Sequence, residues 1–326
     1  MALQKKHVSR ILVFLLLVLL FLGHWSGLYS SLLGLTKPES ISLAILLATA
    51  VLWVSEIIPL YITSLAILLL QIIWLLPAIQ TQGQTATKND FLIAFFSDIT
   101  LLFIGGFVLA KLMNKFNLSD LFARKILKRT GTRPSAILLS IILVSALLSM
   151  WMSNTATAAM MFAIIAPIAQ GLPEGSTFSK ALALSIPFAC NIGGIGTPIG
   201  TPPNAIAMDY LQALSVDITF TKWMAIAIPL MLVLLVLLWR LLLWLYPPKA
   251  TELHLDLKSS KQLSRKQIAV IGIFILTVFG WLSSGQTGIS LGMVGLMVVI
   301  VAFGSKLLDT RDFRNLSWDI LFMLGG

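Results

Sequence analysis

Three consecutive polar residues, Ser153, Asn154 and Thr155, interrupt an apolar stretch that runs from residue 135 to residue 170. Their side chains provide two hydroxyl groups and one carboxamide, which both donate and accept hydrogen bonds. A break between two helices also leaves unpaired carbonyl groups on one side and unpaired N–H groups on the other. Carbonyl and hydroxyl oxygens suit a cation such as Na⁺, whereas the N-terminal end of the helix expected at 156–170 suits an anion.

The residues around the triplet extend this polar character. Ser149 lies four residues before Ser153, a spacing that would place both hydroxyl groups on one face of a helix. Ser, Thr and Asn residues also hydrogen bond between membrane helices without binding any ligand. For an isolated triplet, that packing role is the simpler interpretation.

A second segment, residues 193–204, changes this interpretation. It contains four glycines, including Gly193, Gly194 and Gly196, and three prolines, so a regular helix cannot continue through it. Apolar stretches flank it, and residues 181–208 carry no charge, which disfavours a loop in water. We therefore expect a helix broken at membrane depth, as inverted-repeat transporters use to coordinate substrate and ion.

The end of this segment predicts how the chain resumes a helix. Pro202 and Pro203 have the fixed backbone angle that suits the first turn of a helix. No Gly-Lys-Ser or Gly-Lys-Thr sequence follows the glycines, so a phosphate-gripping nucleotide loop is disfavoured.

Composition places these segments in a membrane. The chain is 58% hydrophobic and 11% charged, with a mean hydropathy of +0.95. A soluble domain carries about 25% charged residues, so this chain cannot cover a water-facing surface. Its net charge of +10 follows from the Lys and Arg of cytoplasmic loops rather than from binding nucleic acid.

Apolar runs and their breaks predict an all-α integral membrane protein with twelve helices. Residues 135–170 are too long for one membrane span, and they contain no polar loop that could join two complete spans. They therefore predict a re-entrant hairpin. The expected helices cover residues 10–28, 40–58, 61–77, 92–113, 135–152, 156–170, 179–192, 203–214, 223–246, 267–284, 288–304 and from 318 onward.

The distribution of charge supports this topology. With the N-terminus in the cytoplasm and both ends of the hairpin 135–170 on that side, 20 of the 23 Lys and Arg residues lie inside. Only Lys37, Lys88 and Lys222 then lie outside. A single crossing at the hairpin would put the basic loop 247–266 outside, against the positive-inside rule.

The chain also contains an internal repeat. Residues 97–106, SDITLLFIGG, resemble residues 317–326, SWDILFMLGG. The preceding helices of the two copies run in opposite directions, as in the inverted repeats of secondary transporters. In the first copy the hairpin and the broken helix follow Gly106, whereas the chain stops at the matching Gly326. We therefore expect a C-terminally truncated chain with an incomplete second repeat.

These observations predict four parts of the chain. They are an N-terminal uncleaved span (1–39), a first repeat (40–246) with the hairpin 135–170 and the broken helix 179–214, a cytoplasmic loop (247–266), and the start of the second repeat (267–326).

At Ser153-Asn154-Thr155 and at Gly200-Thr201-Pro202-Pro203-Asn204, the sequence resembles the divalent anion:sodium symporter family, which carries di- and tricarboxylates or sulfate. The resemblance covers the whole chain, from the Trp-x-x-Glu-x-x-Pro pattern at 53–59 to the final Trp-Asp. It implies a homodimer in which a transport domain moves against a scaffold, and it implies Na⁺ as the coupling ion with no organic cofactor.

The resemblance also implies roles for individual residues. The implied sodium ligands are Ser149, Ser153, Asn154 and Gly200. The substrate carboxylate would meet Asn154, Thr155, Thr201 and Pro202. In the family a second Ser-Asn-Thr completes the site, and this sequence contains no second copy.

The leading hypothesis is a sodium-coupled transporter of succinate, malate or fumarate in the cytoplasmic membrane. The alternatives are a sulfate carrier or dicarboxylate exchanger of the same fold, and a transport-incompetent fragment that lacks the second half-site. An enzyme is disfavoured because no carboxylate pair, His cluster or activated nucleophile converges in the spans.

Overall fold

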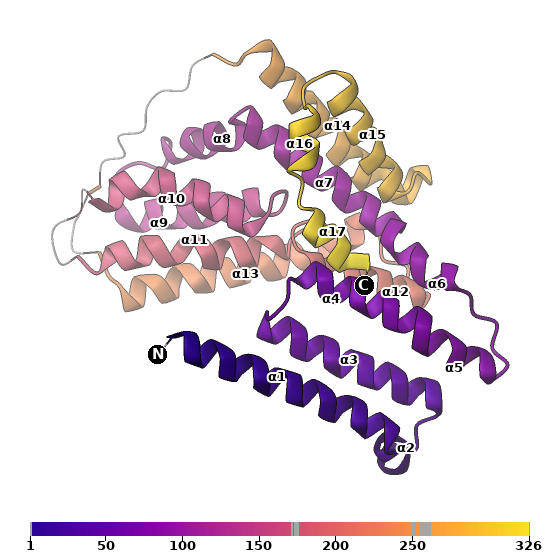
Figure 1. Cartoon of the computed structure of the whole chain (residues 1–326). Helices are drawn as coiled ribbons and strands as arrows, with labels where there is room; N and C mark the ends of the chain where they lie inside the picture. Colours follow the sequence, from indigo (N-terminus) through magenta and orange to yellow (C-terminus); the bar gives the residue numbers. More distant parts are fainter. Residues whose placement is uncertain (1, 171, 173–175, 249–251, 254–261, 326) are drawn as a thin grey trace. The chain divides into compact units, whose positions relative to one another are not determined.

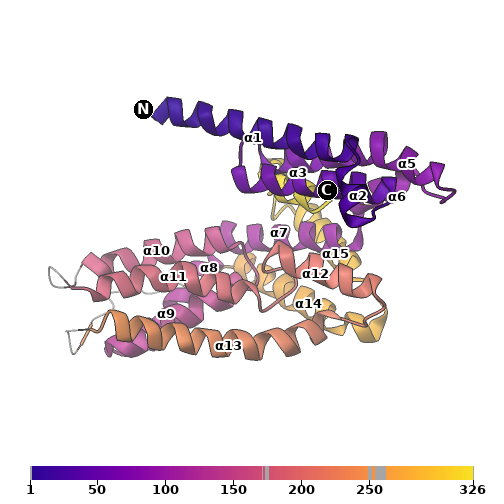
Figure 2. The same cartoon turned by 90° about the horizontal axis from the view of Figure 1, so that it is seen from below.

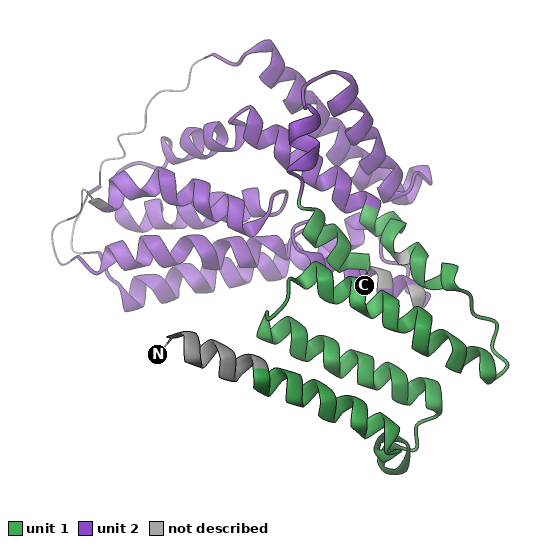
Figure 3. Cartoon of the chain, in the orientation of Figure 1, with its two compact units in different colours: residues 1–100, 317–326 green, residues 101–316 purple. Residues whose placement is uncertain are grey.

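The computed structural model describes residues 2–170, 172, 176–248, 252–253 and 262–325, and the secondary structure within them is entirely helical (Figure 1). The chain forms two compact units, which Figure 3 shows in different colours. Unit 1 comprises residues 1–100 and 317–326, and unit 2 comprises residues 101–316.

Unit 1 is built from apolar helices that lie side by side (Figure 1). Its elements are α1 (Ala2–Trp25), α2 (Leu28–Leu33), α3 (Lys37–Ser55), α4 (Leu60–Leu70), a π-helical segment (Gln71–Leu75), α5 (Leu76–Thr81), α6 (Lys88–Leu92), a 3₁₀ segment (Ile93–Phe96) and α17 (Trp318–Gly325). The helix starts follow local sequence. At α3, Thr36 and Glu39 form a capping box and Pro38 occupies the first turn.

Unit 2 contains both segments that carry the predicted site. Its elements are α7 (Asp98–Lys115, which begins in unit 1), α8 (Leu118–Leu127), α9 (Pro134–Ser149), α10 (Asn154–Gln170), α11 (Phe178–Gly194), α12 (Pro202–Ala213), α13 (Phe220–Leu245), α14 (Arg265–Thr287), α15 (Leu291–Gly304) and α16 (Thr310–Arg314). Helices α9, α10, α11 and α13 lie side by side around an apolar core (Figures 1 and 2).

The described helices have the dimensions and surface of membrane spans. Four are long and apolar enough to cross a bilayer by length and composition: α3, α4 to α5, α13 and α14. Large apolar side chains such as Ile226, Leu237 and Phe279 are 58–70% exposed, which suits contact with lipid rather than water. The prediction of an all-α integral membrane protein is confirmed.

Several predicted helices differ in detail from those observed. The helix predicted at 92–113 begins after a break at Ser97, because a 3₁₀ segment precedes α7. The helix predicted at 61–77 contains a π-helical turn. Helices α7 and α8 meet at 66°, and α8 was not predicted because Asp120, Arg124 and Lys125 interrupt its apolar residues. The short helices α2, α6 and α16 were also not predicted.

Helices α9 and α10 form a helical hairpin, and hydrogen bonds show which segments share its open end. Two bonds lie at that end of unit 2: Leu253 N to Thr132 O at 2.8 Å, and Trp239 Nε1 to Ser135 O at 2.9 Å. At the other end, Thr221 Oγ1 donates to Leu282 O at 2.8 Å. A single crossing at 135–170 would separate Leu253 from Thr132 by the membrane, so these contacts favour the re-entrant hairpin.

This arrangement predicts the outcome of a labelling experiment. Replacing Cys190, the one cysteine in the sequence, by Ala gives a background for single cysteines at exposed positions. We expect Arg133→Cys and Gln262→Cys to react with a membrane-impermeant maleimide from the cytoplasmic side, and Asp217→Cys from the opposite side. Labelling of Arg133→Cys and Gln262→Cys from opposite sides would contradict the hairpin.

Candidate functional site

The hairpin tip is the first half of the predicted site. Helix α9 ends at Ser149, residues 150–152 form a turn, and α10 begins at Asn154. Ser153 caps α10: its Oγ accepts a hydrogen bond from Ala156 N at 3.3 Å, and its carbonyl accepts one from Thr157 N at 3.0 Å. The expectation that Ser149 and Ser153 share one helical face was therefore wrong, because the helix stops between them.

The broken helix is the second half. Helix α11 continues through Gly193 and Gly194, and the non-helical break covers residues 195–201. The prediction of a broken helix is confirmed, but Gly193 and Gly194 belong to its first half rather than to the break. Pro202 and Pro203 begin α12, as predicted.

Glycine is required where two backbones approach each other closely. A Cβ atom at Gly193 would stand 2.4 Å from the backbone of Ala146 in α9. A Cβ atom at Gly200 would stand 2.4 Å from the carbonyl oxygen of Gly194. Gly196 lies against Met231 of α13, whose Sδ would be 2.9 Å from an added Cβ. These glycines let α9, α11 and the break come together.

Asn154 connects the hairpin tip to the broken helix. Its Oδ1 accepts a hydrogen bond from Ser149 Oγ at 2.6 Å, and its Nδ2 donates to Asn191 Oδ1 at 3.0 Å. The buried hydroxyl of Thr197, within the break, donates to the carbonyl of Met150 in the turn. The two breaks in the backbone therefore lie against each other and share hydrogen bonds.

Side chains also satisfy the carbonyl groups that the break exposes. Asn204 Nδ2 donates to Gly194 O and to Thr197 O, both at 2.8 Å. Trp223 of α13 donates from Nε1 to Ile195 O at 3.0 Å. Unpaired carbonyl groups are costly in an apolar surrounding, so these contacts hold the break in one shape.

The carbonyl group of the buried residue Gly200 differs from these because it accepts no hydrogen bond within the described part of the chain. A Cβ atom at Gly194 would stand 3.0 Å from Asn154 Oδ1 and 3.4 Å from Gly200 O, so both oxygens lie beside this glycine. A carboxamide oxygen and a free carbonyl oxygen, with the Ser149 hydroxyl bonded to the former, form a donor set that suits Na⁺.

The other predicted site residues lie around this group. Ser153 and Thr155 are exposed, and Thr201 and Pro202 are half-buried. Among the described residues, no hydrogen bond joins Thr155 directly to Thr201, the two threonines predicted as substrate ligands. No hydrogen bond or ion pair within the described ranges brings a Lys or Arg side chain to the tip or the break.

Sequence reasoning missed three residues that hold this site together, namely Asn191, Thr197 and Asn204. Asn191 is an uncharged polar residue within the apolar stretch 181–192, and that position was the signal that could have identified it. Thr197 and Asn204 lay inside the recognised segment, but their contacts depend on the path of the break.

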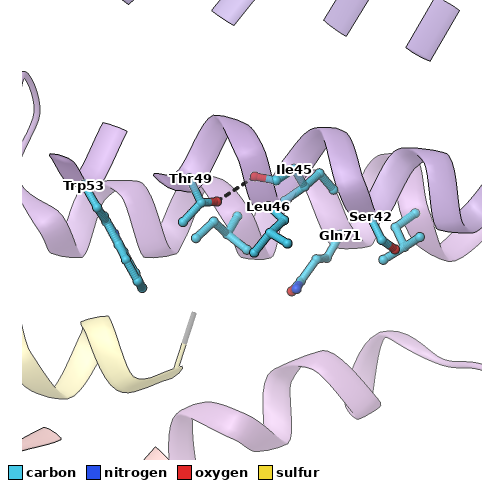
Figure 4. Close-up of a pocket in the computed structure, with 8 residues that line it drawn as sticks. Ser42, Ile45, Leu46, Thr49, Trp53 and Gln71 are labelled. Atoms are coloured by element: carbon cyan, nitrogen blue, oxygen red, sulfur yellow. Dashed lines mark hydrogen bonds between the residues drawn. The ribbon is translucent and has the colours of Figure 1, made fainter. Parts of the chain in front are cut away.

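Unit 1 contains a pocket of about 400 Å³ that includes none of the predicted site residues (Figure 4). Ile45, Leu46 and Trp53 of α3 line it, with Gln71 from the π-helical segment. The hydroxyl of Thr49 is bonded to Ile45 O at 2.7 Å. No group of three His, Cys, Asp or Glu residues suited to a metal occurs in the described part of the chain.

An all-helical membrane protein with a broken helix packed against a helical hairpin belongs to the class of secondary transporters. Residues 50–326 match the family described as Citrate transporter, CitMHS. The chain therefore belongs to the citrate transporter family, whose members are transporters and not enzymes.

Curated relatives agree with this assignment. The chain is 31% identical over 340 residues to the sodium-dependent dicarboxylate transporter SdcS of Staphylococcus saprophyticus, covering 90% of this chain and 63% of that protein. For SdcS of Staphylococcus aureus, identity is 30% over 354 residues, covering 97% and 64%. For the inorganic phosphate transporter PHO87 of Saccharomyces cerevisiae, identity is 29% over 290 residues, covering 87% and 31%. The chain thus spans about one third to two thirds of the length of these relatives.

The close approach at Gly200 generates a test of the site's geometry. We expect Gly200→Ala to destabilise the protein by about 1–3 kcal/mol, because the new methyl group overlaps Gly194 O, and so to lower its melting temperature in detergent by several degrees. Gly272→Ala is the matched control, since a Cβ atom there has no other atom within 4 Å and Ala favours the helix. Equal melting temperatures for the two variants would refute the close approach.

Proposed function

We propose that this chain takes part in sodium-coupled transport of a divalent organic anion, such as succinate, malate or fumarate, across the cytoplasmic membrane. The observation that carries the proposal is the placement of Asn154, whose side chain joins the hairpin tip to the broken helix beside the unbonded carbonyl of Gly200. The names of two relatives, sodium-dependent dicarboxylate transporters, support the coupling ion and the substrate class.

In this proposal, Na⁺ is held by Ser149, Asn154 and Gly200, with Ser153 beside them. The substrate carboxylate meets the exposed side of Asn154 and Thr155, and then Thr201 and Pro202. No basic side chain contributes to this site among the described contacts, so a bound cation and the N-terminal end of α10 supply the positive potential that a dianion requires. Binding of Na⁺ therefore favours binding of the anion.

The wider organisation is part of the same proposal. Residues 40–246 form one inverted repeat, residues 247–266 a cytoplasmic loop, and residues 267–326 the beginning of the second repeat. The N-terminus, residues 1–39, starts in the cytoplasm and provides the first span. A homodimer is the expected assembly, and a second hairpin would complete the substrate site.

Other anions are the main alternatives. A sulfate carrier and a dicarboxylate exchanger would both fit the same fold. The name of the relative PHO87 makes inorganic phosphate a further candidate substrate. These anions share the negative charge that a cation and a helix N-terminus attract. A chain that binds the ion but needs a second half-site for transport is the remaining possibility.

Uptake into proteoliposomes tests the proposal. We expect an inward Na⁺ gradient to drive accumulation of radiolabelled succinate. Excess unlabelled malate or fumarate should compete with succinate for uptake, and sulfate and phosphate should compete poorly. Uptake that is indifferent to Na⁺ would reject symport and indicate exchange. Stronger competition by sulfate or phosphate would reject the dicarboxylate assignment. Sodium-dependent binding of succinate without uptake would identify a chain that binds but does not transport.

The sodium site has a separate test that does not require transport. We expect NaCl, compared with choline chloride, to raise the melting temperature, because an ion that binds the folded state stabilises it. Ser149→Ala should weaken the sodium affinity about tenfold, since it removes a ligand and a hydrogen bond worth roughly 1.5 kcal/mol.

Ser145→Ala is the matched control for this measurement. Ser145 lies one turn earlier on α9, and its buried hydroxyl has no hydrogen-bond partner. We expect this variant to keep the sodium affinity of the unmodified chain. If both serine variants changed the affinity equally, Ser149 would not be a ligand.

A further inference from the structure

Helix α8 carries a second set of features that transport does not explain. It follows α7 at an angle of 66°, and it packs against α9 and α10 through a buried side that includes Leu118, Ala123 and Leu127. The remaining surface of the helix is both apolar and basic. Apolar and basic side chains on one helix can contact both the acyl chains and the anionic headgroups of lipids.

An apolar pocket of about 160 Å³ opens beside α8. Phe122 and Ile126 of α8 line it, together with Leu147 of α9, Trp151 of the hairpin turn and Phe274 of α14. Phe122 is 42% and Leu147 49% exposed, so the pocket is open to the surroundings. Its size and its apolar lining suit a segment of hydrocarbon chain.

Exposed basic residues follow the pocket along the chain. Lys125, Lys128, Arg129 and Arg133 are exposed, and none of them pairs with a carboxylate in the described structure. Lys125 lies in the last turn of α8, and Arg129 lies four residues further on, in the turn that follows this helix. Like charges this close along the chain repel each other. Arg124, in contrast, is neutralised by Asp120 at 2.8 Å. An anion beside Lys125 and Arg129 would relieve their repulsion.

The order of these features along the hairpin matches the order of groups in a phospholipid. At the first turn of α8, Ser119 Oγ contacts Met152 Sδ at the hairpin tip, at 3.1 Å. Beyond its last turn, Thr130 Oγ1 donates to Ser140 Oγ at 2.9 Å, nearer the open end of the hairpin. The basic residues therefore lie toward the predicted cytoplasmic surface, and the pocket extends toward the membrane interior.

We propose that this surface binds an anionic phospholipid of the cytoplasmic leaflet. The phosphate group lies between Lys125 and Arg129, and part of one acyl chain fills the pocket at Phe122 and Trp151. A free inorganic anion would leave the apolar pocket empty, and a zwitterionic lipid would not neutralise the two cations. The site borders the turn that contains Trp151, two residues from Ser149, and it does not depend on which anion is transported.

Quenching of tryptophan fluorescence by brominated lipids tests this proposal. The full chain is reconstituted in phosphatidylcholine nanodiscs that contain a minor fraction of brominated phosphatidylglycerol or brominated phosphatidylcholine. The signal of Trp151 is the difference between the unmodified chain and Trp151→Phe. We expect brominated phosphatidylglycerol to quench this signal at a mole fraction on the order of tenfold lower, because each basic group near the surface favours an anionic lipid.

Two double variants distinguish binding at this site from a general attraction of anionic lipids to basic residues. Lys125→Gln with Arg129→Gln should remove the preference, whereas Arg311→Gln with Arg314→Gln, an equal loss of charge at exposed residues of α16, should keep it. Equal quenching by both lipids, or a preference that survives in the first variant, would overturn the proposal. Displacement by inorganic phosphate would show a site for free anions instead, and displacement by an acidic peptide a protein-binding surface.

Discussion

The structure of unit 2 depends on one constraint: backbone that is not helical at membrane depth must have its polar groups satisfied by protein or water. The chain breaks twice in apolar surroundings, at the hairpin tip and in the broken helix. Thr197 bonds to the carbonyl of the first break, and Asn204 and Trp223 bond to carbonyls of the second. The second break thus helps to hold the first, and side chains of α12 and α13 hold the second.

The same constraint explains why the site is built from neutral groups. A charged side chain in the membrane is costly unless it is paired or hydrated, whereas amide, hydroxyl and carbonyl groups are already required to satisfy the backbone. Asn154 serves both needs, since its carboxamide bonds to Ser149 and Asn191 and its oxygen lies beside Gly194. A site of this kind has little charge of its own, which is the physical reason to expect that an anion is bound together with a cation.

Much of the fold could be predicted from the sequence, because apolar runs, prolines and glycines act locally. Pro202 marked the start of α12, and the triplet at Ser153 marked the hairpin tip. The contacts between the breaks could not be predicted, since they depend on three-dimensional paths. Ser149 was expected to be aligned with Ser153 along a helix, but the helix ends between them. Asn191 was missed because nothing in its local sequence shows that it faces Asn154.

The hydrogen bonds between the two breaks also have a mechanical consequence. Gly193 packs on the backbone of Ala146, and Thr197 is bonded to Met150, so α9 and α11 are joined at the level of the site. Elements joined by buried, satisfied polar contacts move together, because separating them would expose donors and acceptors to an apolar surrounding. An ion that bound Asn154 and Gly200 would strengthen the same junction. Binding would therefore stabilise the hairpin and the broken helix as one body, and it would do so without changing the charge of any side chain.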